Sequence, residues 1–305
     1  MKKIFIDANI YLSFFDNSKP ELKKLLDSLV EIKNSLFIGS QIVDEVNRNK
    51  LSVAQRSLCN HFKNLENLKK INLPEHLEWE STDLQNWNTQ SKDIYDKQES
   101  LQKELKNLIQ KTLGEIMCSK DKVSQTFHPL FEGALEASEI EIQAARYRRE
   151  IGNPPGKLND PLGDQISWEQ FLNCSRSSEE IWIITKDSDY YTSFKGKTYL
   201  NSFLYNELLM INASSHSIFC FDSLAQGLKH FNENSSQKID KLPTDEELKV
   251  ITEEEVSNSE NQVERLEFFP IIEQGKLTYM SLPPQFKSPN QYIQYLRAFD
   301  SEDRD

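Results

Sequence analysis

The stretch MKKIFIDANIYLSFF, residues 1–15, sets the interpretation of the whole chain. Residues 2–6 form a compact run containing Ile and Phe, which predicts a short buried strand. Asp7 follows this run directly, and Ala8-Asn9 then leads into IYLSFF, which reads as the start of a helix. In parallel α/β sheets, ligands bind beyond the carboxyl ends of the strands. The stretch therefore predicts an α/β fold in which Asp7 lies at the binding edge of the sheet.

Further apolar patterns complete this fold. Short apolar runs predict strands at residues 35–39, 181–185 and 217–221. Helical spacing predicts helices over 19–33, after a Ser40 cap, from Asp164 onward and over 224–231. The order of strands and helices predicts a short parallel sheet flanked by helices.

A long helical region separates the second and third predicted strands. Residues 52–151 are expected to be almost wholly helical, with a break at His128-Pro129-Leu130. A second helix is expected over residues 133–150, followed by a strong breaker at residues 152–156.

Three more acidic residues occupy places similar to that of Asp7. Glu45 lies about a turn into the helix after the second strand, Asp164 at a helix start, and Asp187 just past the third strand. We expect the four acids to meet at one edge of the sheet. Taken singly, each has an ordinary explanation: a helix cap, a solvated helix residue, a helix-dipole partner, and an Asx turn formed with Asp189.

Such a group of acids favours hard divalent cations, because carboxylate oxygens are the ligands of Mg²⁺ and Mn²⁺. Two ions about 4 Å apart can activate a water and stabilise the leaving oxygen of a phosphodiester. The expected reaction is in-line hydrolysis that leaves a 5′-phosphate and a 3′-hydroxyl. Asn9 is expected to bind a metal or a carboxylate, Thr185 to position a water, and Asp189 to join Asp187 at the metal.

Basic residues near these acids are candidates for binding phosphate. Arg48 and Lys157 are predicted to contact the substrate. Arg146 and Arg149 lie three residues apart and share a helix face, so we assign them the same role. The alternative for these two arginines is ordinary exposed charge.

The composition fits a globular protein of the cytoplasm. The chain has 305 residues, of which 37% are hydrophobic and 28% charged. It contains no apolar run of about 18 residues, and no signal peptide is expected at its start. The cysteines are scattered without a CxxC pair, which excludes a recognisable zinc or disulfide framework.

The net charge of −12 is unusual for a protein that binds nucleic acid. Residues 233–267 hold eleven acidic and four basic side chains, a local net charge of −7. Over half of the negative charge is therefore concentrated in one late segment, which is expected to be a linker or a weakly structured helix. As a hypothesis, this segment mimics nucleic acid and covers a binding face, while the alternative is a solubilising linker.

The segments FIDANIYLSFF, IVDEVNRNK, PLGDQISWEQFL and IITKDSDYY together resemble a PIN domain over about residues 3–225, in its larger bacterial form with a helical insertion. The resemblance implies a Rossmann-like PIN fold and a Mg²⁺- or Mn²⁺-dependent endonuclease, usually of single-stranded RNA. The family's acids fall on Asp7, Glu45, Asp164 and Asp187, with Asp189 as a further acid. The expected organisation is a nuclease domain at 1–231 with its insertion at 52–151, an acidic linker at 232–267 and a C-terminal extension at 268–305.

Three functions follow as hypotheses. The first is an RNA endonuclease, a toxin-like or antiphage effector that an operon-encoded protein partner inhibits. The second is a structure-specific or single-stranded DNA nuclease. The third is a non-catalytic PIN scaffold for protein interaction, against which the intact acids argue. The insertion and the C-terminal extension are the expected places for contacts between copies of the chain.

Overall fold

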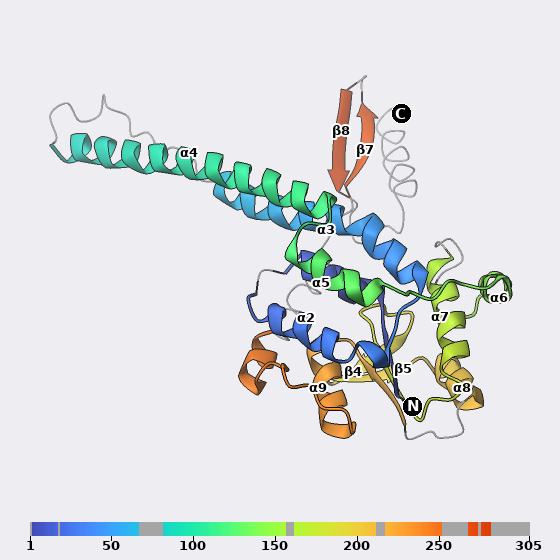
Figure 1. The fold of residues 1–305 in the computed structure, drawn as a ribbon. Helices are drawn as coiled ribbons and strands as arrows, with labels where there is room; N and C mark the ends of the chain where they lie inside the picture. Colours follow the sequence, from blue (N-terminus) through green and yellow to red (C-terminus); the bar gives the residue numbers. More distant parts are fainter. Residues whose placement is uncertain are drawn as a thin grey trace, which may run out of the picture. The chain divides into compact units, whose positions relative to one another are not determined.

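The computed structural model describes residues 2–17, 19–66, 82–156, 162–211, 217–251, 268–273 and 276–281. The chain divides into two compact units, Met1–Ile251 and Thr252–Asp305. The first unit contains the sheet and all the predicted site residues, so it is described first (Figure 1).

A parallel sheet of four strands forms the centre of this unit. Its strands are β1 (Lys2–Ile6), β2 (Leu36–Phe37), β3 (Glu180–Ile184) and β6 (Ile218–Phe221), in the spatial order β2-β1-β3-β6. In the register, Ile6 pairs with Ile184 and Phe5 with Phe37. The predicted α/β fold and its four strands are thus confirmed. The carboxyl ends of β1 and β3 lie side by side, which places the residues after them together.

Helices flank the sheet. They are α1 (Ala8–Leu12), α2 (Leu22–Glu31), α3 (Ser40–Glu66), α7 (Gly163–Cys174), α8 (Ser202–Ile211) and α9 (Leu224–Asn234), with short 3-10 turns at Ser13–Phe15 and Lys33–Ser35. Aromatic side chains seal the sheet to α7, because the ring of Phe5 lies 5.1 Å from that of Phe171 and 6.2 Å from that of Trp168. Burying such large rings is a major source of stability in a core of this kind.

The described part of the predicted insertion, residues 52–66 and 82–151, is mostly helical, and its first helix is the outer part of α3. It continues with α4 (Thr82–Met117), α5 (Lys122–Phe131) and α6 (Glu139–Glu150). Helices α3 and α4 pack along each other and extend away from the sheet (Figure 1). Helix α5 instead joins the core, since Phe127 is buried against Tyr11 and Phe14.

The predicted break at residues 128–130 is wrong, because α5 runs through Pro129 to Phe131. Pro129 lacks the N–H that would donate to the carbonyl of Gln125, so α5 continues through it with one hydrogen bond fewer. The packing of the neighbouring Phe127 and Leu130 in the core holds this turn helical. Among the residues of this region that the structure describes, the interruptions lie at 118–121 and 132–138 instead.

A hairpin after β3 and the helix that follows it had no counterpart in the sequence prediction. Strands β4 (Tyr191–Phe194) and β5 (Lys197–Leu200) form an antiparallel hairpin, which is followed by α8. Lys195 and Gly196 at its tip both have positive φ, 49° and 75°. This is the backbone that a two-residue hairpin turn requires.

The segment after α9 belongs to the first unit as far as residue 251. Ile239, Leu248 and Ile251 are buried with the core, and residues 245–251 are helical. The predicted start of the acidic linker at residue 232 therefore lies inside this unit, while residues 252–267 lie outside the described residues. In the second unit, β7 (Phe268–Glu273) and β8 (Lys276–Ser281) pair as an antiparallel hairpin.

Two glycines provide a test of the packing. A Cβ on Gly227 in α9 would lie 2.5 Å from Cδ1 of the buried Ile184, whereas a Cβ on Gly114 in α4 would meet nothing within 4 Å. We expect Gly227→Ala to lower the free energy of unfolding by about 1–3 kcal/mol through overpacking. Gly114→Ala should raise it by up to about 1 kcal/mol through helix propensity. Urea denaturation measures both, and equal effects of the two substitutions would contradict this account of α9.

Candidate active site

Asp7 lies at the junction of the two central strands. Its backbone N–H donates to the carbonyl of Ile184 at 3.0 Å, which extends the pairing of β1 with β3. Its Oδ1 accepts from the amide of Ala8 at 2.7 Å, and its Oδ2 accepts from Asn9 Nδ2 at 2.6 Å and from Thr185 Oγ1 at 2.7 Å. The carboxylate is therefore oriented from both sides by short hydrogen bonds.

The electrostatics of Asp7 are those of a buried acid among other acids. Only 7% of the residue is exposed. Burial raises the pKa of Asp7 to about 7, the hydrogen bond from Thr185 opposes the shift, and repulsion by Glu45 and Asp187 adds to it. The metal-free protein thus disfavours a negative charge at this position.

Asp187 lies in a turn at the end of β3. Its amide donates to Thr185 Oγ1 at 3.0 Å, and its Oδ1 accepts from the amide of Asp189 at 2.9 Å. The second contact is the Asx turn that the sequence offered as the ordinary explanation. Thr185 therefore links the two acids, because it donates to Asp7 and accepts from Asp187.

Glu45 and Asp164 come from two helices, α3 and α7. Burial is the largest cause of the raised pKa of Glu45, and repulsion by Asp164 and Asp187 adds to the shift. The positive charge of Arg48 opposes it. A Cβ on Gly163 would lie 3.9 Å from Glu45 Oε2, so the first turn of α7 passes close to this carboxylate. The start of α7 and the second turn of α3 thus bring these two acids together.

Tyr190 was missed by the sequence prediction and is buried near this group. Its hydroxyl is buried and has no hydrogen-bond partner among the described residues. Burial raises the pKa of Tyr190 well above the ordinary value. Repulsion by each of the four acids raises it further, and the effect of Asp7 is the largest of the four. A single phenol that is affected by every one of these carboxylates places them in one neighbourhood. Its position directly after Asp187-Ser188-Asp189 was the available signal.

A metal ion is chemically suited to this neighbourhood, although the side chains are not closed around one. Within the described ranges, no group of three or more His, Cys, Asp or Glu lies close enough together to hold an ion. The donors are nonetheless carboxylates: Glu45 and Asp187 raise the pKa of Asp7, and Asp164 and Asp187 raise that of Glu45, which is the repulsion that a divalent cation relieves. Asp7, Glu45, Asp164 and Asp187 are the carboxylates that would hold such an ion.

The predicted phosphate-binding residues do not all lie beside the four acids. Arg48 acts on Glu45 electrostatically, whereas Arg146 forms a 4.0 Å ion pair with Glu139 on its own helix. Arg149 is half-buried on the same helix, and no contact joins it or Arg146 to the four acids in the described structure. Lys157 lies outside the described residues.

The neighbouring Arg148, by contrast, is structural. Its buried guanidinium binds Glu169 of α7 at 2.7 Å and Glu207 of α8 at 2.6 Å. It also donates to the carbonyl of Pro154 at 2.6 Å, while Trp168 donates to the same Glu207. Arg148 therefore ties α6 to α7 and α8.

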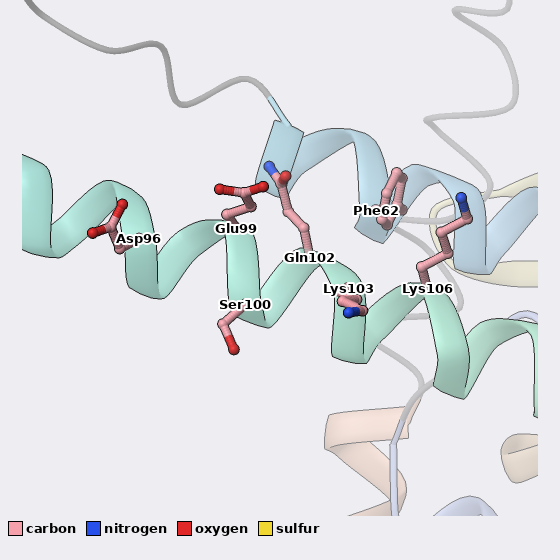
Figure 2. A pocket seen from close by; sticks show the side chains of 7 residues that line it. All are labelled: Phe62, Asp96, Glu99, Ser100, Gln102, Lys103 and Lys106. Carbon is pink, nitrogen blue, oxygen red and sulfur yellow. The ribbon is translucent and has the colours of Figure 1, made fainter.

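A hollow of about 570 Å³ lies away from these acids, between α3 and α4. Figure 2 shows that Phe62 comes from α3 and the other labelled residues from α4. Its charged residues are two acids, Asp96 and Glu99, and two bases, Lys103 and Lys106. Because these charges balance, the hollow offers no charge preference for a ligand.

Comparison with known proteins gives one match. The sequence profile of the PIN domain family matches residues 4–190, which include all four acids and the helical insertion. No curated protein and no solved structure matches the chain. No helix among the described residues is long and apolar enough to cross a membrane.

The raised pKa of Asp7 predicts a pH-dependent effect on stability. The folded protein holds this proton more tightly than the unfolded chain, so Asp7 costs stability as the pH rises from about 4 to about 7, and the cost is complete above that. We expect Asp7→Asn to raise the Tm of the metal-free protein by about 5 °C at about pH 8, and by much less at about pH 4.5.

Calorimetry in EDTA measures the effect, with the exposed Asp44→Asn on α3 as the control that should change little. Adding Mg²⁺ should raise the Tm of the parent and not that of Asp7→Asn. A variant that is less stable than the parent at both pH values would contradict this account of Asp7.

Proposed function

Because the chain belongs to the PIN domain family, whose members are generally metal-dependent nucleases of RNA or DNA, we propose that it is a Mg²⁺- or Mn²⁺-dependent endonuclease of single-stranded RNA. One observation carries the proposal: acids from four separate segments lie near one another, since Thr185 hydrogen-bonds to both Asp7 and Asp187, a Cβ on Gly163 beside Asp164 would lie 3.9 Å from Glu45 Oε2, and Glu45 raises the pKa of Asp7. The choice of RNA over DNA rests on the resemblance to the family.

In this proposal the four carboxylates are the metal ligands and the catalytic residues. A bound divalent cation would supply a polarised phosphate and a more acidic attacking water. Asp189 contributes through its amide, which fixes the rotation of the Asp187 carboxylate. The proposed role of Arg48 is to contact the phosphate backbone beside Glu45.

Thr185 and Asn9 act in this proposal by orienting Asp7. Thr185 donates to Asp7 Oδ2, and Asn9 donates to the same oxygen while its own Oδ1 accepts from the amide of Lys186. These contacts hold the acid at the end of β1 against the turn after β3. Preorganised ligands of this kind need little rearrangement when the ion and substrate bind.

Cleavage assays test the proposal. Labelled single-stranded RNA, single-stranded DNA and flap DNA are incubated with the full chain and Mg²⁺ or Mn²⁺, and we expect RNA to be cut fastest. Asp7→Asn and Asp187→Asn should each lower the rate at least about 100-fold, because each removes a carboxylate that the metal chemistry needs. EDTA should abolish cleavage.

The exposed Asp44→Asn serves as the matched control, since Asp44 lies beside Glu45 in the sequence and carries the same charge. Preference for DNA in the same assay would overturn the choice of RNA alone. Equal rates for the parent and both site variants would overturn the site. A parent that cuts none of the three substrates would favour the scaffold hypothesis.

The proposed biological role is that of a toxin-like or antiphage effector that a protein partner inhibits. Induced expression of the parent without a partner should then arrest bacterial growth, because single-stranded RNA is exposed throughout the cytoplasm. Asp187→Asn at equal expression should grow normally. Growth curves and RNA integrity measure this, and equal arrest by both proteins would contradict a role that depends on cleavage.

A further inference from the structure

We propose that the β4–β5 hairpin is a binding surface for single-stranded nucleic acid, on which Phe194 and Tyr199 stack against bases and Lys195 and Lys197 contact phosphates. The proposal rests on the nuclease function proposed above and assigns the part of the chain that holds the strand beside the acids. Its residues were not among the predicted site residues.

The pairing register divides the hairpin into two faces. Tyr191 pairs with Leu200, and both pack against the core of the first unit. Phe194 pairs with Lys197, and Thr192 with Tyr199. Since directly paired residues share a face and side chains alternate along a strand, these four lie on the face opposite Tyr191 and Leu200.

The outer face carries exposed rings with positive charge beside them. Phe194 is 64% exposed and Tyr199 48% exposed. Lys195 Nζ lies 5.5 Å from the centre of the Phe194 ring, and Lys197 Nζ lies 5.3 Å from that of Tyr199. In the described structure neither lysine forms an ion pair with a carboxylate, although the chain has a net charge of −12. Each ring therefore has a nearby cation that is available to a phosphate.

The hairpin is attached to the candidate active site at both ends. Its first strand begins one residue after Tyr190, whose amide donates to the carbonyl of Asp187 at 3.1 Å. At the other end, the amide of Asn201 donates to the carbonyl of Tyr190 at 2.7 Å, and Asn201 Nδ2 donates to that of Asp189 at 3.5 Å. The base of the hairpin therefore adjoins the Asp187–Asp189 turn.

Exposed aromatic rings beside lysines match the chemistry of single strands. Unpaired bases stack on aromatic side chains with little sequence preference, while lysines follow the backbone charge. A second copy of the chain fits this surface less well, because a stable dimer interface buries about 800 Å² per partner. A turn with two aromatic rings offers only a fraction of that area.

Fluorescence anisotropy with the full chain in EDTA tests the proposal, because binding is then measured without cleavage. The probes are labelled oligouridine and oligothymidine of about 20 nucleotides. We expect Phe194→Ala and Tyr199→Ala to raise Kd roughly tenfold each by removing a stacked base. Tyr199→Phe keeps the ring and should bind as the parent does.

Salt dependence separates the lysines from the rings. The double variant Lys195→Gln/Lys197→Gln should reduce the slope of log Kd against log salt by about 1.4, since each phosphate contact on a single strand contributes about 0.7. The ring variants should leave the slope unchanged. The matched controls are Lys103→Gln/Lys106→Gln, two exposed lysines of α4 (Figure 2), and the exposed Trp87→Ala. Neither control should change Kd or the slope comparably.

Two results would overturn the proposal. The first is a parent that binds neither oligonucleotide, or hairpin variants that bind with the Kd and slope of the parent. The second is self-association of the parent that the ring variants abolish while binding stays unchanged, which would assign the surface to a second copy. Failure of the nuclease proposal is seen separately, as absence of cleavage in Mg²⁺ or Mn²⁺ by a parent that still binds in EDTA.

Discussion

The structure depends on the burial of one carboxylate between the ends of two parallel strands. Asp7 continues β1, its amide pairs with Ile184, and its Oδ2 accepts from Thr185, the first residue after β3. The unfavourable burial of this acid is tolerated because several donors satisfy it and because the apolar strands β1 and β3 are themselves buried. The same contact that joins the strands therefore also sets the position of the candidate active site.

The central strands and the order of the acids could be predicted because apolar runs and strand-end residues are local signals. Residues 2–6 and 181–184 are short runs rich in apolar residues, and such runs are typical of buried strands. The hairpin β4–β5 was not predictable in this way, since its outer face keeps Phe194 and Tyr199 exposed and its turn is Lys195-Gly196 rather than a stronger signal such as Asn-Gly. Tyr190 was missed because burial near the acids is a tertiary property.

The three arginines of α6 show why charge in a sequence does not reveal its role. Arg146, Arg148 and Arg149 look alike in the sequence, yet Arg148 is buried in ion pairs with Glu169 and Glu207. Those partners are distant in the sequence and are brought to it only by the packing of α6, α7 and α8. Removing either glutamate would leave the buried cation with only one of its two carboxylates, so this group stabilises the arrangement of three helices rather than binding a ligand.

Helix α3 gives the insertion a mechanical connection to the acids. The helix runs continuously from Ser40 to Glu66 and carries Glu45 in its second turn. Farther from the acids it packs along α4. At 1.5 Å per residue, its far end lies about 30 Å from Glu45. Because the helix is one rod of that length, a rotation of its outer end would also turn Glu45 relative to Asp7 and Asp187, which follow β1 and β3 of the sheet.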